Sequence, residues 1–214
     1  HAHRHQAHAF VVDAHVVVDV LDAVLADDDD ARHAAGHPAL HLDEVVPAAE
    51  AAPPPPGLGV LDLEGEGILV GNASSGMFLM HSECLASGYV EPRPFRVNAG
   101  PVHAYVLVSG GKTKYLSELK AGDEGLAVDA EGRGRRVVVG RVKIERRPLV
   151  LVEAEAGGRR FSTIVQNAET IRFTAPGSKA ISVSELKVGD TVLVRTEEGG
   201  RHFGMHIKET ITER

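Results

Sequence analysis

Short apolar runs separated by glycine-rich turns dominate the chain from Gly57 onward. Several of these runs alternate apolar and polar positions, and a period of two indicates a half-buried antiparallel strand. Strands are predicted at Gly67–Val70, Gly76–Met80, Val102–Val108, Gly125–Val128, Arg136–Ile144, Leu149–Glu155, Arg160–Gln166, Thr170–Thr174, Thr191–Arg195 and His202–Ile207. No long amphipathic helix is predicted in this part. Many short strands with glycine-rich turns predict a mainly β fold, built as barrel-like or sandwich modules.

One sequence motif occurs twice. Tyr115–Asp123 reads YLSELKAGD and Val183–Asp190 reads VSELKVGD, and each copy leads into a predicted strand. We expect Ser117 and Ser184 to cap a single helical turn, after which Gly-Asp turns the chain into the strand. The leucine after each Ser-Glu pair is expected to plug the open end of a barrel. The repeat therefore predicts two related β-modules about 67 residues apart.

Residues 1–56 differ in composition from the rest of the chain. They contain eight of the twelve histidines and end on Pro53–Pro56, which we expect to form a stiff, extended spacer. One helix is predicted near Ala14–Ala26, although the valines of Val16–Val20 are equally compatible with a strand. We interpret residues 1–56 as a short, low-complexity, partly helical N-terminal arm and residues 57–214 as the main, β-rich domain.

The net charge of -7 is concentrated in the arm. Residues 1–56 hold ten Asp and Glu against two Arg, which leaves 20 acidic and 21 basic residues, a net charge of +1, for residues 57–214. A nearly neutral domain with local basic clusters fits a small anionic ligand better than a nucleic acid. The sequence has no secretory signal and no apolar run of about 20 residues, so we expect no membrane partner and a cytoplasmic location. The single cysteine, Cys84, also fits a reducing compartment.

Two glycine-rich segments look like phosphate-binding loops but lack required positions. Gly110–Thr113 would need another glycine where Val106 stands to form a P-loop. Gly57–Gly59 is not followed by the third glycine of the dinucleotide-binding fingerprint. Motifs typical of zinc sites and of serine hydrolases are also missing from the sequence.

Polar side chains that can carry chemistry gather in residues 66–115. His81 and Glu83 are two residues apart, so on a strand they would share a face and form an acid–base or metal-ligand pair. The alternative is an ordinary surface pair. Arg93 and Arg96 flank a stiff proline, and two guanidiniums with a fixed spread suit a carboxylate or a phosphate. The alternative for them is a pair of solvated arginines.

The second half of the same stretch adds further candidates. Asn98 offers a neutral hydrogen-bond donor and His103 a general base. Lys112 and Lys114 follow two glycines, where burial would make a lysine amine reactive towards a carbonyl. The polar turn at Gln166–Glu169 is expected to approach the same site. Taken singly, these residues indicate only a β-rich domain with a polar site that tolerates anions.

The residue identities in several segments are more specific than the spacing of the polar residues. GILVGNASSGMFLMHSE, RPFRVNAGPVHAYV, GGKTKYLSELKAGDE, GRVKIERRP, IVQNAETIRF and GRHFGM together resemble the 3-dehydroquinate synthase type II family, over residues 66–214 and in the family's order. The resemblance implies an enzyme of the shikimate route to aromatic amino acids. It would carry out NAD-dependent oxidative deamination of 2-amino-3,7-dideoxy-D-threo-hept-6-ulosonate and cyclisation to 3-dehydroquinate.

Two alternatives remain open beside that activity. A related branch of the family makes 3-amino-4-hydroxybenzoate from a similar precursor. Members of the family also carry a large N-terminal half, in whose place this chain has residues 1–56, so a truncated, inactive β-barrel fragment is the other alternative. Strand edges left exposed by a missing half would favour a homo-oligomer.

The implied reaction gives roles to the candidate residues. Candidates for substrate binding are Arg93, Arg96, Asn98 and Lys112, and candidates for catalysis are His81, Glu83, His103 and Lys114. A sugar-acid carboxylate needs a cationic clamp, which the two arginines would form. Either histidine can act as the base, and Lys114, Asn98 or a bound divalent metal can polarise the carbonyl during cyclisation. The sequence assigns no residue to NAD and no ligand to a metal.

Overall fold

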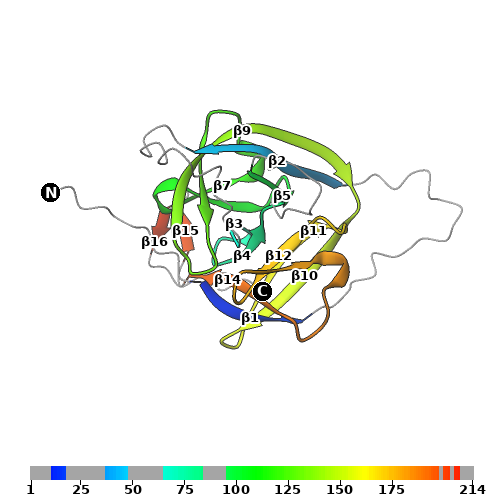
Figure 1. Cartoon of the computed structure of the whole chain (residues 1–214). Helices are drawn as coiled ribbons and strands as arrows, with labels where there is room; N and C mark the ends of the chain where they lie inside the picture. Colours follow the sequence, from blue (N-terminus) through cyan, green and yellow to red (C-terminus); the bar gives the residue numbers. More distant parts are fainter. Residues whose placement is uncertain are drawn as a thin grey trace, which may run out of the picture.

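The computed structural model describes residues 11–17, 37–47, 65–83, 95–197, 200–202 and 205–207. Strands and three single-turn 3-10 helices make up the regular structure of these parts (Figure 1), so the prediction of a mainly β fold is confirmed. The strands are β1 (Val11–Val17), β2 (His37–Pro47), β3 (Gly67–Ala73), β4 (Gly76–His81), β5 (Phe95–Pro101), β6 (Tyr105–Val108), β7 (Lys112–Tyr115), β8 (Glu124–Val128), β9 (Gly134–Arg147), β10 (Leu149–Ala156), β11 (Arg159–Gln166), β12 (Arg172–Ala175), β13 (Lys179–Ser182), β14 (Thr191–Thr196), β15 (Gly200–His202) and β16 (Met205–Ile207). The 3-10 helices are η1 (Ser109–Gly111), η2 (Leu116–Glu118) and η3 (Val183–Glu185).

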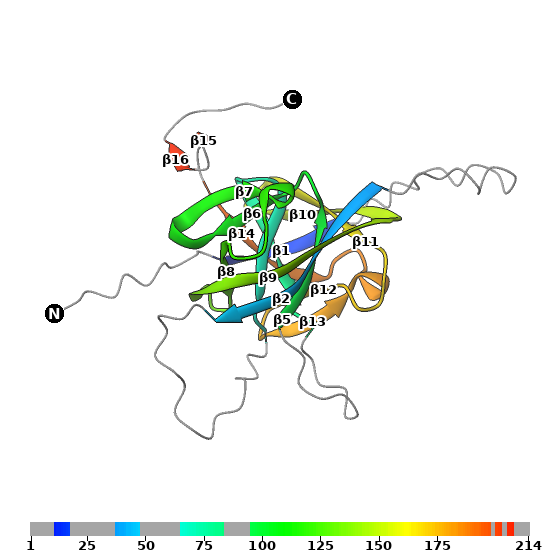
Figure 2. The ribbon, with the colours of Figure 1, turned by 90° about the horizontal axis from the view of Figure 1, so that it is seen from above.

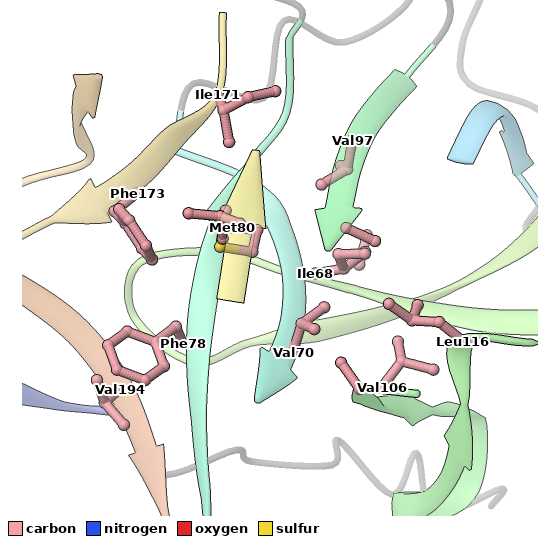
Figure 3. Close-up of a cluster of buried hydrophobic side chains, with 14 of the residues drawn as sticks. Ile68, Val70, Phe78, Met80, Val97, Val106, Leu116, Ile171, Phe173 and Val194 are labelled. Carbon is pink, nitrogen blue, oxygen red and sulfur yellow. The ribbon is translucent and has the colours of Figure 1, made fainter. Parts of the chain in front are cut away.

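The hairpin of β3 and β4 is the centre of the sheet. β3 pairs with β4, β6 and β8, while β4 also pairs with β12 and β14. Both strands are buried on both faces, which explains why they read as continuous apolar runs rather than as alternating ones. One face of the hairpin packs into the main core cluster through Ile68, Val70, Phe78 and Met80 (Figure 3). The other face packs into a second cluster through Leu69, Met77 and Leu79.

Two β-modules of the same design pack against this hairpin. In the hairpin of β6 and β7, Val106 pairs with Lys114, and in the hairpin of β12 and β13, Phe173 pairs with Ile181. Each residue of the second pair lies 67 positions after its counterpart in the first, and the same shift relates all four pairs of the two hairpins. The prediction of two related modules is thus confirmed in the strand register.

The modules attach to different strands of the central hairpin. Val70 on β3 pairs with Val106, and Met80 on β4 pairs with Phe173. The shift of 67 residues between the modules therefore corresponds to a shift of ten residues within the hairpin. β3 and β4 exchange places under an approximate two-fold relation, in which residues 67–71 of β3 correspond to residues 77–81 of β4.

A single 3-10 turn follows each module hairpin and leads into the next strand, as the repeated motif predicts. The backbone N–H of Lys120 donates to Asp123 Oδ2 at 3.3 Å, and that of Lys187 donates to Asp190 Oδ2 at 2.8 Å. The leucine of each motif packs against the main core cluster, fully buried in the first copy and partly buried in the second. The aspartate and the leucine are thus structural in both copies.

The predicted serine caps are wrong. In the first turn, Glu118 Oε2 accepts the backbone N–H of Tyr115 at 2.7 Å, so a carboxylate supplies the acceptor. In the second turn, the acceptor is the hydroxyl of Ser182, which the N–H of Ser184 reaches at 3.3 Å. The first capping group, Glu118, lies within the shared motif, whereas the second, Ser182, precedes it.

Within residues 57–214, three strands were not predicted from the pattern, and one predicted strand is shorter. β5 contains Asn98, Gly100 and Pro101, which all disfavour strands, and β7 and β13 are short and largely polar. The strand predicted from Val102 begins only at Tyr105, because the chain turns between β5 and β6. The strand predicted at the C-terminal end is divided into β15 and β16, which form a separate two-stranded ribbon (Figure 2).

Two strands come from the N-terminal arm. β1 pairs with β10 and β14, and β2 pairs with β9 and β5, with register shifts near Leu42. Residues 14–17 of the predicted helix belong to β1, and the rest of that helix lies outside the described residues. The division of the chain at residue 56 stays a prediction.

Candidate functional site

Polar residues meet at one end of the central hairpin, where β4 ends and β3 begins. The backbone N–H of Ser82 donates to the carbonyl of Glu66 at 2.9 Å, and that of Glu83 donates to the carbonyl of Arg96 at 2.7 Å. These bonds bring β5 against the end of the hairpin. We call this group the His81 corner, and its members are Glu66, His81, Glu83, Phe95, Arg96 and Arg135.

His81 is the last residue of β4 and is 3% exposed. It pairs with Gly67, whose lack of a side chain is required here, because a Cβ would lie 1.8 Å from the carbonyl oxygen of Met80. His81 Nδ1 lies 2.6 Å from the carbonyl oxygen of Ser82. Since a carbonyl oxygen only accepts, Nδ1 must carry the proton, and the neutral ring then has its lone pair on Nε2. This is the tautomer of a base that acts through Nε2.

Glu83 and Arg96 form an ion pair beside His81. Arg96 Nε lies 3.3 Å from Glu83 Oε2, with 36% of the arginine and 17% of the glutamate side chain exposed. Because β4 ends at His81, strand alternation does not extend to Glu83, and this carboxylate faces Arg96. The structure therefore pairs Glu83 with Arg96, and Glu83 lies two residues after the buried His81.

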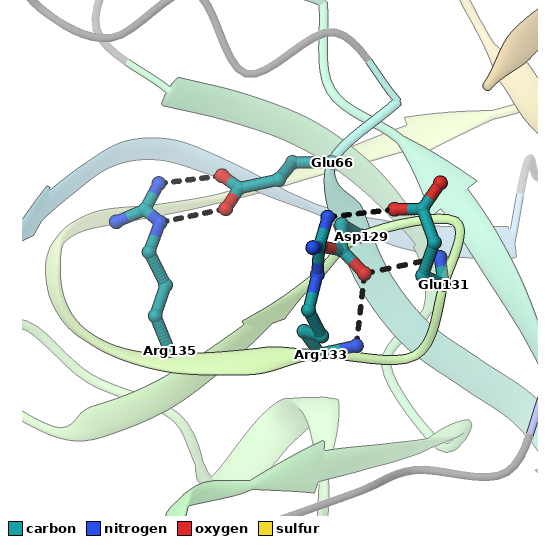
Figure 4. Close-up of polar contacts among 5 residues, drawn as sticks. All are labelled: Glu66, Asp129, Glu131, Arg133 and Arg135. Atoms are coloured by element: carbon teal, nitrogen blue, oxygen red, sulfur yellow. Dashed lines mark hydrogen bonds and ion pairs between the residues drawn. The ribbon is translucent and has the colours of Figure 1, made fainter. Parts of the chain in front are cut away.

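A second ion pair, between Glu66 and Arg135, was not predicted (Figure 4). Arg135 Nε and Nη2 donate to Glu66 Oε1 and Oε2 at 2.8 and 2.6 Å, and the Glu66 side chain is only 7% exposed. The Arg135 guanidinium also lies over the ring of Phe95, with Cζ 5.8 Å from the ring centroid. Because Phe95 precedes Arg96, the contact of Arg135 with Phe95 and the ion pair of Arg96 with Glu83 both lie at the start of β5. The two partners are 69 residues apart, so no local pattern signals the pair.

The loop before Arg135 explains how that arginine reaches the corner. Asp129 Oδ1 accepts the backbone N–H groups of Glu131 and Arg133 at 3.0 and 2.8 Å, and Oδ2 accepts Arg133 Nε at 2.6 Å (Figure 4). These bonds close the tight turn between β8 and β9. Arg135 then leaves the turn on β9 with its side chain directed at Glu66.

Asn98 lies two residues after Arg96 on the same strand and is buried. Its Nδ2 donates to Gln166 Oε1 at 3.0 Å, so the polar turn after β11 does approach the strand that carries the candidates. β5 and β11 come close because residue 100 is glycine, where a Cβ would lie 2.7 Å from the carbonyl oxygen of Ile164. Gln166 thus joins the site residues.

His103, Lys112 and Lys114 form no described contact with the His81 corner. His103 is exposed in the turn between β5 and β6, and Lys112 is exposed at the start of β7. β6 and β3 lie between β7 and β4, so three strand spacings, roughly 14 Å across the sheet, separate Lys114 from the corner. The candidates therefore divide into two groups.

The Gly-Gly-Lys segment is a hairpin turn. Gly110 and Gly111 have φ values of 76° and 70°, which the turn between β6 and β7 requires. The counterparts in the second module, Gly177 and Ser178, have φ values of 72° and 62°. The same turn therefore occurs in both modules, and it accounts for the two glycines without a bound phosphate.

Lys114 forms an ion pair with Asp123. Its Nζ donates to Asp123 Oδ2 at 2.9 Å, and this bond, opposed by burial, holds the pKa of Asp123 below its ordinary value. The second module has Ile181 in the position of Lys114 and still forms the same turn around Asp190. The lysine is therefore not needed for the turn.

Replacing Lys114 with isoleucine is expected to leave the fold intact and to raise the pKa of Asp123. A lowered carboxyl pKa contributes stability that is present above the unfolded value of about 3.9 and is lost as the pH falls through the folded value. The variant should therefore lack this contribution at neutral pH, and its stability should fall less than that of the native chain as the pH drops below about 4. NMR titration of the Asp123 carboxyl carbon measures the change. Lys112→Ile is the control, and an unchanged pKa in Lys114→Ile would contradict the assignment.

The described residues do not form a standard site for NAD or for a metal. They include no α-helix, so they offer no helix N-terminus to hold a pyrophosphate. Within the same residues, no group of three His, Cys, Asp or Glu side chains is placed to hold a metal ion. Nor does this part of the chain contain a helix with the length and apolar character that crossing a membrane requires. Arg93 and Cys84 lie outside the described residues.

Comparison with known proteins places the His81 corner inside a family domain. Residues 60–214 match the family described as the 3-dehydroquinate synthase II C-terminal domain. The chain therefore belongs to the 3-dehydroquinate synthase II family, as the resemblance indicated. No solved structure matches the chain.

The relatives are archaeal proteins named 3-dehydroquinate synthase. That of Methanopyrus kandleri is 65% identical over 154 residues, which cover 71% of this chain and 38% of the relative. That of Methanothermobacter thermautotrophicus is 62% identical over 150 residues, covering 70% and 40%. That of Methanospirillum hungatei is 61% identical over 154 residues, covering 72% and 47%. The matched part of this chain spans less than half the length of these relatives.

Proposed function

We propose that this chain takes part in the 3-dehydroquinate synthase reaction. The reaction is an NAD-dependent oxidative deamination of 2-amino-3,7-dideoxy-D-threo-hept-6-ulosonate, which releases ammonia, followed by cyclisation to 3-dehydroquinate. The observation that carries the proposal is the family match over residues 60–214, which includes every member of the His81 corner. The ligand is a small anionic sugar acid and the location is the cytoplasm. Association of the chain with further copies through strand edges belongs to the same proposal.

His81 is the residue that we assign as the base. Cyclisation is an intramolecular aldol reaction, in which a proton is removed beside one carbonyl while another carbonyl is polarised. The buried ring with its Nδ1 proton held by Ser82 has the lone pair on Nε2, which suits proton removal. His103 is exposed in a turn and has no such orientation, so it is the weaker candidate.

The other corner residues bind and orient the substrate in this proposal. Arg96 offers its guanidinium to the carboxylate, and Glu83 holds that guanidinium in place. Asn98, two residues after Arg96 on β5 and oriented by Gln166, is a neutral group that can polarise a carbonyl. Lys114 is the alternative for polarising the carbonyl, although two strands, β6 and β3, lie between its strand and β4. Because the described residues form no standard NAD site, we derive no step through that cofactor.

Absorbance of NADH tests the proposal directly. The full chain is incubated with NAD and the amino-heptulosonate, with and without manganese, and the products are separated. NADH together with 3-dehydroquinate is the expected result. An aminohydroxybenzoate product without NADH would assign the chain to the other branch of the family. If a folded sample forms neither NADH nor either product, the result would instead favour the alternative of an inactive β-barrel.

A further inference from the structure

The two halves of the sheet have the same register where β8 and β14 join the central hairpin. Gly67 on β3 pairs with Val128 on β8, and Met77 on β4 pairs with Arg195 on β14. The partners on the hairpin are ten positions apart and the partners on the outer strands are 67 positions apart, as in the two modules. β14 is therefore the counterpart of β8, position by position.

The outer edge of β8 carries the segment that directly follows it in the chain. After a turn of five residues, β9 pairs back on β8, and Val138 lies opposite Glu124. Under the shift of 67 residues, Thr191 on β14 corresponds to Glu124, and Met205 on β16 corresponds to Val138. The outer edge of β14 is thus expected to carry the segment of β15 and β16, with Met205 opposite Thr191.

In the structure, a strand from the N-terminal arm occupies that edge instead. His15 on β1 lies opposite Thr191, Val12 lies opposite Val194, and β1 also pairs with β10. β15 and β16 pair with each other in a separate two-stranded ribbon (Figure 2). Because an isolated two-stranded ribbon is marginally stable in water, its strands gain stability by joining a larger sheet.

The sequence between β14 and β15 suits the turn that such a pairing needs. Gly132, in the turn between β8 and β9, has a φ of 79°, a conformation that favours glycine. The residue 67 positions later, Gly199, is also a glycine, and a glutamate precedes both glycines. The chain after β14 therefore has the residue that a turn of the β8–β9 type requires.

The distances along the chain also favour the C-terminal segment over β1. Met205 follows Thr191 by 14 positions, whereas His15 precedes Thr191 by 176 positions. Closing the shorter loop costs less conformational entropy, and this term taken alone favours the C-terminal segment by about fortyfold.

We propose that the segment of β15 and β16 binds to the outer edge of β14 in place of β1, so that two segments of one chain compete for one edge. The C-terminal segment is the main occupant in solution, because its loop is short and its turn has the required glycine. Its binding releases β1 from β14 and continues the sheet as β9 continues it beside β8. The edge of β14 is thus a docking site within the chain, and β1 is its exchangeable occupant.

Disulfide trapping in the full chain measures this competition. Cys84→Ser removes the natural thiol, and Thr191→Cys, His15→Cys and Met205→Cys are combined in one variant. Opposite residues of antiparallel strands lie at distances that a disulfide can span. After mild oxidation and proteolysis, mass spectrometry is expected to find the disulfide between positions 191 and 205 about tenfold more often than that between positions 191 and 15. A major product that joins positions 191 and 15 would overturn the proposal.

The first half of the sheet supplies the positive control for trapping. Glu124→Cys combined with Val138→Cys, again with Cys84→Ser, places thiols at the two positions that pair between β8 and β9. This disulfide should form readily. If it forms and the one between positions 191 and 205 does not, the C-terminal segment does not bind at β14.

Two single proline variants test the same exchange without any disulfide. Val12 lies opposite Val194 in the pairing with β1, and His202 takes that place in the proposed pairing. Proline breaks the hydrogen-bond ladder of a strand that is paired on both sides. His202→Pro should therefore lower the melting temperature more than Val12→Pro does, and the reverse order would refute the proposal. Neither test uses substrate or cofactor, so the outcome does not depend on the proposed function.

Discussion

Replacing His81 with glutamine is expected to lower turnover of the amino-heptulosonate by about two to four orders of magnitude, because a positioned general base contributes that much. Glutamine keeps a polar, buried side chain of similar length but cannot take a proton. The ring in the native protein is 3% exposed and oriented by Ser82, so its removal leaves no other imidazole in the described corner. Product formation under saturating substrate measures the loss.

Two comparisons decide whether the base has been assigned correctly. Circular dichroism must show that His81→Gln is folded, since the residue pairs with Gly67 inside the core hairpin. His103→Gln is the rival variant. If His103→Gln loses more activity than His81→Gln, the exposed turn between β5 and β6 carries the base, and our assignment fails.

Replacing Phe78 with alanine is expected to lower the free energy of unfolding by about 3–5 kcal/mol, the usual cost of truncating a buried phenylalanine. The side chain is 0% exposed, and its ring centroid lies 5.7 Å from that of Phe173 (Figure 3). Phe78 belongs to the central hairpin and Phe173 to the second module, so the cavity would open where the two pack together. Urea denaturation measures the effect.

The matched control for this variant is Val188→Ala. Val188 is 69% exposed in the loop before β14, so its truncation should change the free energy of unfolding by less than about 0.5 kcal/mol. A loss below about 1 kcal/mol for Phe78→Ala would show that the core closes around the gap. The hairpin would then be less central to stability than its burial indicates.

The apolar strands and the repeated modules could be predicted from the sequence because their signals are local. The runs at Gly67–Val70 and Gly76–Met80 are read directly as strands, and the repeated motif marks both modules. β5 could not be predicted, because Asn98 and Gly100 disfavour a strand and are tolerated only where β11 comes close. Tertiary contacts override local preference there.

The contacts of the candidate site could be predicted in part for the same reason. His81 and Glu83 stand out locally, and the structure adds Arg96 as the partner of the carboxylate. Glu66 and Arg135 are distant in sequence, and only the pairing of β3, β8 and β9 brings them together. Chemical character is visible in a sequence, whereas the partner of a charge depends on topology.

The central hairpin also determines how the protein must fold. Neither module has a complete sheet of its own, because each pairs with one strand of a hairpin that both share. Contacts such as Val70 with Val106 and Met80 with Phe173 close long loops, which slows folding relative to proteins with local contacts. The two modules should therefore unfold in one cooperative transition. A destabilising substitution in either module should lower the melting temperature of both.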